Sequence, residues 1–192
     1  MKLYLIRHGQ SEANVKKVFC GHNDLPLTEQ GRKDAENCRN IIEGITFDKV
    51  YSSDLSRAIE TQQIAYPCEC VERLAMIREI DVGSLKGMFF ADAELDPDIR
   101  ENWRAWQFRK FGGEDYADVK KRATDFLDLV LKTGCEKVVA FSHGGFIQMV
   151  CDVVLETYLV KKHLSCYNCG IFVFEYVNDN WYMRVSNYNG TL

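Results

Sequence analysis

Three short polar clusters contain the side chains of this sequence that are best suited to chemistry. They are Arg7-His8-Gly9, Ser52-Ser53-Asp54 followed by Arg57, and Ser142-His143-Gly144. An arginine side chain presents a planar fork of donors that suits phosphate oxygens, and a neutral histidine is a competent nucleophile toward phosphorus. Two arginines and two histidines at one site would therefore favour phosphoryl transfer that relies on electrostatic stabilisation.

Each cluster directly follows a segment that we predict to be a strand. The three segments are Lys2–Ile6, Lys49–Tyr51 and Lys137–Phe141, and the last is apolar enough to be covered on both faces. The carboxyl ends of strands in an open α/β sheet line one crevice. We therefore expect the three clusters to converge although they lie far apart in the sequence.

Helical segments alternate with these strands. Thr28 is typical of a helix N-cap and precedes an apolar face of Ala35, Cys38 and Ile42. Two more helices are predicted over Leu55–Ala65 and around Val119–Val130, and another is expected to begin after Ser142.

The remaining strand signals lie near Cys68–Val71 and in the tail, where Ile171–Tyr176 and Trp181–Val185 flank a turn and predict a hairpin. Together with the alternating helices they indicate an α/β fold. We expect a three-layer α/β/α sandwich with a mostly parallel central sheet and an antiparallel edge near the C-terminus.

Composition limits the classes of function. The chain has 192 residues, of which 46% are hydrophobic and 27% are charged, and its formal net charge is -4. These values are typical of a globular protein, and the length fits one domain spanning residues 1–192. A mildly acidic chain lacks the basic surface that general nucleic-acid binding requires.

No apolar stretch reaches the roughly 18 residues of a membrane-spanning helix. The apolar N-terminal residues are too few for a signal peptide because Arg7 and His8 follow at once. We therefore expect a cytoplasmic protein with no membrane partner, present as a monomer or a homodimer.

Eight cysteines occur in the chain. Cys166 and Cys169 have the spacing of half a zinc site, but no second pair completes it, and the spacing of Cys68 and Cys70 is wrong for one. In a chain without a secretion signal we expect no disulfide framework, no metal, and buried or half-buried thiols that serve packing.

The segment 83–113 is predicted to be irregular. It combines many charges with the aromatic residues Phe89, Phe90, Trp103, Trp106, Phe108 and Phe111. Two interpretations are open: a hydrophobic flap over the active site, or a satellite cluster beneath a loop.

Five ordered motifs carry a resemblance to a known family. The stretch from Leu5 to Asn14 contains Arg-His-Gly, and the blocks 21–28, 52–58, 78–80 and 141–145 follow in the family's order. The stretch 111–115 also resembles a Pro-Gly-Gly-Glu-Ser motif. The sequence thus resembles the phosphoglycerate mutase-like branch of the histidine phosphatase superfamily over nearly its whole length.

The resemblance implies a role for each matching residue. His8 would be the nucleophile that becomes phosphohistidine, with its other ring nitrogen held by a backbone carbonyl. Arg7, Arg57 and His143 would hold the phosphoryl group, and Glu79 would protonate the leaving alkoxide and then activate water. The residues expected to line the phosphate and substrate are Asn14, Cys20, Gly21 and Gly144. No cofactor or metal is implied.

The implied reaction is metal-independent hydrolysis of a small phosphorylated metabolite. The alternatives are an α-ribazole 5′-phosphate phosphatase of cobalamin synthesis, a phosphoglycerate-type phosphomutase, and a phosphate-binding protein without turnover. The family's aromatic and Trp-Glu-Gly residues after the acid are replaced here by Val82-Gly83 and Leu85-Lys86-Gly87. For single residues a structural interpretation stays open, with Arg7-His8 as a polar turn, His143 as a helix-end histidine and Glu79 on a solvated face.

Overall fold

A six-stranded sheet forms the centre of the computed structural model, which describes residues 1–158 and 164–190. The strands lie in the order β3-β2-β4-β1-β5-β6. Their bounds are β1 Lys2–Arg7, β2 Lys49–Ser52, β3 Val71–Arg73, β4 Lys137–Ser142, β5 Ile171–Val177 and β6 Asn180–Tyr188.

The first four strands in this order are parallel to one another, and each of the last two is antiparallel to the strand before it. β4 pairs in parallel with β1 and β2, and β2 pairs in parallel with β3. β5 runs antiparallel to β1 and forms a hairpin with β6. The predicted mostly parallel sheet with an antiparallel C-terminal edge is therefore confirmed.

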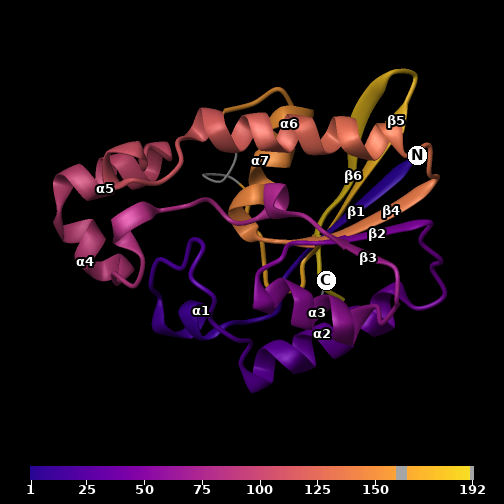
Figure 1. Cartoon of the computed structure of the whole chain (residues 1–192), viewed down its shortest axis with the longest axis horizontal. Coiled ribbons are helices and arrows are strands. Elements are labelled where there is room, and N and C mark those ends of the chain that lie inside the picture. The colour runs from indigo at the N-terminus through magenta and orange to yellow at the C-terminus, as the bar shows by residue number, and fades with distance from the viewer. Residues whose placement is uncertain (159–163, 191–192) are drawn as a thin grey trace.

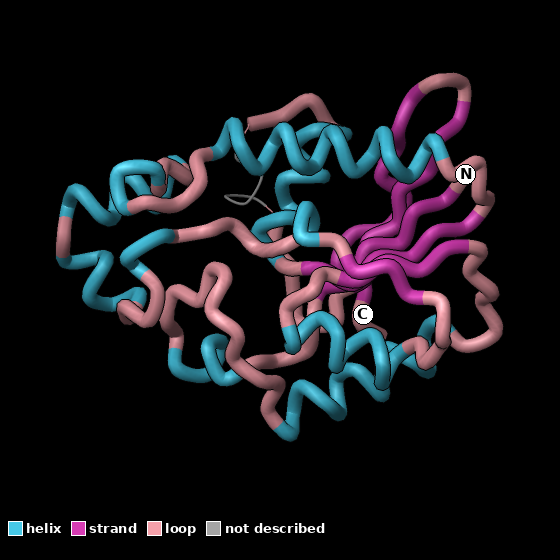
Figure 2. The backbone as a smooth tube through the Cα atoms, viewed as in Figure 1, coloured by secondary structure: helices cyan, strands magenta, loops and turns pink. Residues whose placement is uncertain are grey.

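Helices cover both faces of the sheet (Figures 1 and 2). α2 and α3 lie on one face, and α6 and α7 lie on the other. The helix bounds are α1 Glu12–Lys16, α2 Glu29–Ile42, α3 Ser56–Ala65, α4 Phe90–Leu95, α5 Pro97–Ala105, α6 Tyr116–Lys132 and α7 Gly144–Val154. Short 3-10 turns occur at Ala75–Ile77, Gly83–Leu85 and Arg109–Phe111.

Local sequence signals explain the longer helices. The Thr28 side chain accepts the Gly31 N–H at the start of α2, whose residues Ala35, Cys38 and Ile42 are buried as predicted. α6 begins at an Asp115 capping box and buries the apolar stripe that the sequence predicted. Two apolar clusters, one on each face, result from this packing.

The prediction of an irregular 83–113 segment was wrong in part, because α4 and α5 form within it. Asp96 caps α5 by accepting the N–H groups of Asp98 and Ile99, and Pro97 occupies the first turn. The third strand also begins later than expected, at Val71, because only Val71–Arg73 finds partners along β2.

The cysteine prediction needs one correction. Cys68 and Cys70 are exposed because they precede the short edge strand β3, while the other cysteines are buried or half-buried. Burial raises the pKa of the Cys38 and Cys166 thiols to about 12. In the described part of the chain no helix is both long and apolar enough to span a membrane.

Candidate active site

The register of three parallel strands brings the polar clusters together. Arg7 pairs with Ser142 across β1 and β4, and Ser52 pairs with Phe141 across β2 and β4. The chain then leaves the sheet at the carboxyl end of each of these three strands, which lie at the same side of the sheet. The His8 N–H accordingly donates to the Ser142 carbonyl at 2.9 Å. The predicted convergence of the three polar clusters is therefore confirmed.

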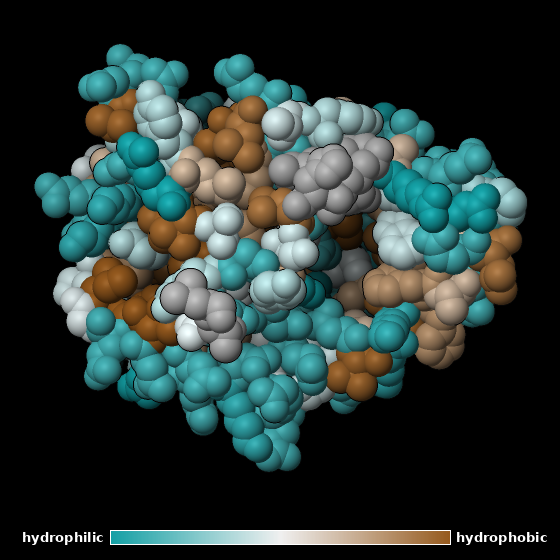
Figure 3. Space-filling model, turned by 180° about the vertical axis from the view of Figure 1, so that it is seen from behind, coloured by the Kyte–Doolittle hydropathy of each residue, from teal (hydrophilic) through white to brown (hydrophobic). Residues whose placement is uncertain are grey.

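A cavity of about 310 Å³ opens at the carboxyl ends of these strands. Its lining includes eight of the residues singled out in the sequence: Arg7, His8, Asn14, Cys20, Gly21, Arg57, Glu79 and Gly144. His143 lies behind His8 and does not line the cavity, with the two ring centroids 5.2 Å apart. Seen from behind, the surface is hollowed beside the lobe that contains α4 and α5 (Figure 3).

His8 is buried and has one defined ring orientation. Its Nδ1 lies 2.7 Å from the Gly9 carbonyl oxygen. Because a carbonyl only accepts, Nδ1 carries the proton, and Nε2 keeps its lone pair. Burial lowers the pKa of His8 well below its usual value, and Arg57 and Arg7 lower it further. His8 is thus a neutral imidazole with a free ring nitrogen at the cavity wall.

His143 is completely buried at the N-terminus of α7. Its Nε2 lies 2.8 Å from the Ser53 hydroxyl, while Nδ1 has no hydrogen-bond partner among the residues that the structure describes. Burial lowers its pKa well below the usual value, and the charge of Arg57 adds to the shift.

The two arginines are held by backbone carbonyls. The buried Arg57 guanidinium donates to Asn23 O at 2.8 Å and to Gly21 O at 2.9 Å. Arg7 Nη1 donates to Cys166 O, and Arg7 Nε is a second buried donor without a partner in the described chain.

These features fit an anion. Buried polar atoms in native proteins nearly always have a partner, and the Arg7 Nε–H can only donate, so this orphaned group indicates a ligand that accepts hydrogen bonds. The N-terminus of α7 adds a positive dipole end at the same place. A phosphoryl group is an anion of this kind, with several oxygens that accept hydrogen bonds.

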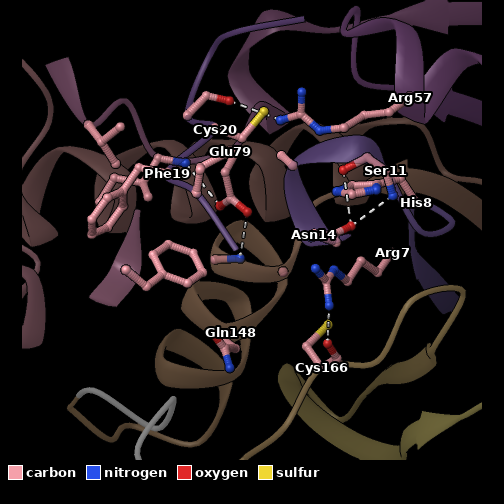
Figure 4. A pocket seen from close by; sticks show the side chains of 18 of the residues that line it. Arg7, His8, Ser11, Asn14, Phe19, Cys20, Arg57, Glu79, Gln148 and Cys166 are labelled. Carbon is pink, nitrogen blue, oxygen red and sulfur yellow. Dashed lines mark hydrogen bonds between the residues drawn. The ribbon is translucent and has the colours of Figure 1, made fainter. Parts of the chain in front are cut away.

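Glu79 lies between Phe19 on one side of the cavity and the side chains of Arg7, His8 and Arg57 on the other (Figure 4). Its Oε1 accepts the Ile80 N–H at 3.0 Å, and its Oε2 accepts the Gly145 N–H at 3.2 Å. The carboxylate faces the cavity instead of a solvated surface.

A polar network behind Glu79 was missed by sequence reasoning. His22 Nε2 donates to the Glu79 carbonyl at 2.8 Å, and Arg122 donates to the carbonyls of Met76 and Arg78. Arg122 also forms a two-pronged pair with Glu114, at 2.8 Å for each contact. His22 and Glu114 lie inside the quoted motifs, so the motifs could have indicated them. Arg122 shows no local signal.

The other predicted lining residues have distinct environments. The amide oxygen of Asn14 accepts from Ser11 and Asn168, which leaves its NH₂ group for the cavity. Gly21 has a φ of +52°, and a Cβ there would lie 3.0 Å from Val82. Its carbonyl holds Arg57, so Gly21 shapes the site through the arginine.

Cys20 and Gly144 complete the predicted set. The Cys20 thiol donates to Asn23 O at 3.2 Å, and burial raises its pKa. A Cβ at Gly144 would approach Arg7 Nε to 3.3 Å, so the glycine lets this arginine lie against the start of α7. Among the described residues no group of three His, Cys, Asp or Glu side chains is placed to hold a metal ion.

Comparisons with known proteins agree with this geometry. Residues 3–189 match the model of the histidine phosphatase superfamily (branch 1), so the chain belongs to this superfamily. It is 30% identical over 192 residues to a broad-specificity phosphatase of Saccharomyces cerevisiae, covering 94% of this chain and 81% of that protein. It is 34% identical over 168 residues to a 2,3-bisphosphoglycerate-dependent phosphoglycerate mutase of Parvibaculum lavamentivorans, covering 76% of each.

Among solved structures, a histidine-to-alanine variant of Entamoeba histolytica phosphoserine phosphatase with bound phosphoserine superposes with a TM-score of 0.88. That chain is 28% identical, and the match covers 98% of both chains. The resemblance inferred from the motifs is therefore confirmed, and the relatives include both phosphatases and a mutase.

Proposed function

We propose that this member of the histidine phosphatase superfamily hydrolyses small phosphate monoesters through a phosphohistidine on His8. The observation that carries the proposal is the arrangement at His8. A neutral imidazole with a free Nε2 lies at the cavity wall next to two arginines, one of which has an unpartnered buried donor. Phosphatase relatives support the general reaction.

In the first step the Nε2 lone pair of His8 attacks phosphorus and the bond to the ester oxygen breaks. Arg7, Arg57 and His143 stabilise the charge on the three non-bridging oxygens, and their fixed positions avoid reorganisation. Glu79 supplies the proton that the departing alkoxide needs, because an alkoxide is a poor leaving group near neutral pH.

In the second step the Glu79 carboxylate removes a proton from a water molecule, which attacks the phosphorus of phosphohistidine. The P–N bond breaks, inorganic phosphate leaves, and His8 returns to the neutral form with Nε2 free. Arg7, His8, Arg57 and Glu79 line the cavity, and His143 lies next to the His8 ring, which supports this cycle.

The test is hydrolysis of p-nitrophenyl phosphate in the presence of a metal chelator. We expect turnover by the wild-type protein and a loss of at least about 10³-fold in the His8→Ala variant, because no other nucleophile occupies this position. Rapid acid quench should trap a phosphoryl group on the peptide that contains His8. Undiminished turnover by His8→Ala would overturn the mechanism.

Two alternatives give different results in the same assay series. A phosphoglycerate-type mutase would be stimulated by 2,3-bisphosphoglycerate and would form an exchange product with 3-phosphoglycerate. A protein without turnover would bind phosphate but release none from any ester, including α-ribazole 5′-phosphate.

A further inference from the structure

We infer that the alcohol part of the substrate carries an apolar, aromatic group and no carboxylate. This inference rests on the proposed hydrolase function and concerns the half of the cavity that lies beyond Glu79. Figure 4 shows Arg7, His8 and Arg57 on one side of the pocket and Phe19 on the other.

Aromatic side chains build the far wall. Phe19 lies edge-on to Phe90 and to Trp103, with ring centroids 4.9 Å apart in both pairs. Phe90 stacks on Trp103 at 5.1 Å, and Phe108 lies 6.3 Å from Phe19. Phe19, Phe90, Trp103 and Phe108 all line the cavity, together with Trp106. Such a wall favours an apolar or aromatic surface on the ligand.

The basic residues of the 83–113 segment do not line this cavity. There are five: Lys86, Arg100, Arg104, Arg109 and Lys110. Four of them form ion pairs, namely Lys86 with Asp81, Arg104 with Glu94, Arg109 with Asp118, and Lys110 with Asp98. Arg100 donates to the Glu94 carbonyl. These charges are therefore engaged with partners outside the described lining of the cavity.

The ionisable side chains that line the cavity in the described chain, thiols aside, are Arg7, His8, Arg57 and Glu79. All four are assigned to the phosphoryl group or to the leaving oxygen. Among the described residues, the aromatic half of the pocket offers no further cation to a carboxylate on the substrate, which would lose its hydration there without compensation. A phenyl group would instead exchange water for ring contacts.

The experiment compares three alkyl esters with similar leaving groups: 2-phenylethyl phosphate, propyl phosphate and 3-phosphonooxypropanoate. We expect kcat/KM to be about 10- to 30-fold higher for the phenylethyl ester than for the propyl ester, as burial of one ring predicts. The carboxylate ester should fall below the propyl ester, and phosphoserine should behave likewise. Equal or higher kcat/KM for the carboxylate ester would overturn the inference.

Two adjacent phenylalanines provide matched variants. Phe90 lines the cavity, whereas the Phe89 side chain is 53% exposed and does not. Phe90→Ala should reduce the ratio of phenylethyl to propyl kcat/KM by about tenfold. Phe89→Ala should leave that ratio unchanged. An equal effect of both variants would contradict a specific role for the wall.

Binding to the His8→Ala variant separates this inference from the proposed function. Calorimetry should show tighter binding of the phenylethyl ester than of the carboxylate ester. If that order holds but the wild-type protein hydrolyses no ester, the hydrolase proposal fails and the wall keeps its specificity. If hydrolysis occurs but the order is absent, the wall inference alone fails.

Discussion

The two ring nitrogens of His143 have different surroundings, and together they define its protonation. Nδ1 is buried without a partner in the described chain, and Nε2 faces the Ser53 hydroxyl. A phosphoryl oxygen accepts hydrogen bonds, so a useful Nδ1 must carry the proton. Since the lowered pKa keeps the ring neutral, Nε2 must accept from Ser53. In the proposed mechanism Ser53 thus positions the tautomer of His143.

Ser53→Ala tests this role. Without the hydroxyl donor the ring can adopt the other tautomer, and we expect kcat to fall about tenfold, the value of one hydrogen bond. Nitrogen-15 spectra of the imidazole should show a change from the Nδ1–H form to a mixture. Ser52→Ala is the matched control, because the buried Ser52 hydroxyl bonds the Ser53 carbonyl and not the ring. A tautomer that is unchanged in Ser53→Ala would contradict the assignment.

Sequence motifs identified side chains that line the cavity and the cluster that contains Ser53, but not which residue orients which. Arg7 and His8 follow a strand in a recognisable order, and the topology of parallel strands is enough to bring them near Arg57. The bond between Ser53 and His143 spans 90 residues and depends on how two loops leave the sheet. Nothing in the local spacing encodes that contact, so only the fold reveals it.

At the scale of elements, the first turn of α7 holds the proposed proton donor. The Gly145 N–H donates to the Glu79 carboxylate, and a Cβ at Gly145 would lie 2.3 Å from Glu79 Oε1. The glycine therefore permits a close approach between the helix and the acid. The Glu79 carboxylate lies at the end of a flexible side chain, so a larger residue at position 145 would displace the carboxylate more easily than it would distort the helix.

Gly145→Ala should separate activity from stability. The alanine favours the helix by up to about 1 kcal/mol, which should keep the free energy of unfolding near that of the wild-type protein. The kcat/KM for alkyl phosphates reports the step that breaks the ester bond and not the later attack of water, and it should fall about 10²-fold because protonation of the alkoxide depends on the position of Glu79. p-Nitrophenyl phosphate has a better leaving group and should be affected much less. The same ester dependence in Glu79→Gln is the positive control, and equal losses for both esters would contradict it.

The elements that sequence analysis described least well lie in the 83–113 segment. α4 and α5 have six and nine residues, which is less than the window of about 11 residues in which a helical period is recognised. The start signal at Asp96 and Pro97 was present in the sequence. The sequence left two interpretations of this segment, a flap over the site or a satellite cluster beneath a loop. Choosing between them requires contacts such as that of Phe90 with Phe19, which lies more than 70 residues earlier in the chain. Those contacts are tertiary and are not encoded in local spacing.

At the scale of the whole molecule, the sheet separates two apolar clusters, and the candidate site lies at the carboxyl ends of the parallel strands. His8 and His143 are buried there with exposed fractions of 3% and 0%. Folding therefore removes two ionisable rings from water as it assembles the site. Protonation of these rings is therefore linked to the free energy of unfolding of the whole protein.

Acid destabilisation is the consequence. Unfolded histidine titrates near pH 6.5, and in the folded protein the pKa of His8 and of His143 lies well below that value. Between these limits the unfolded state binds more protons, so the free energy of unfolding falls as the pH decreases. At pH values below 6.5 and above the lowered pKa of the folded protein, each ring should contribute up to about 1.4 kcal/mol per pH unit. Urea titrations in phosphate-free buffer measure this slope without stabilisation by bound anion.

The variants His8→Asn and His143→Asn should each take up about one proton fewer on unfolding and so have a smaller slope. Gln148 also lines the cavity but does not titrate, so Gln148→Ala should retain the wild-type slope. Equal slopes in all four proteins would mean that the two imidazoles are not buried in the neutral form.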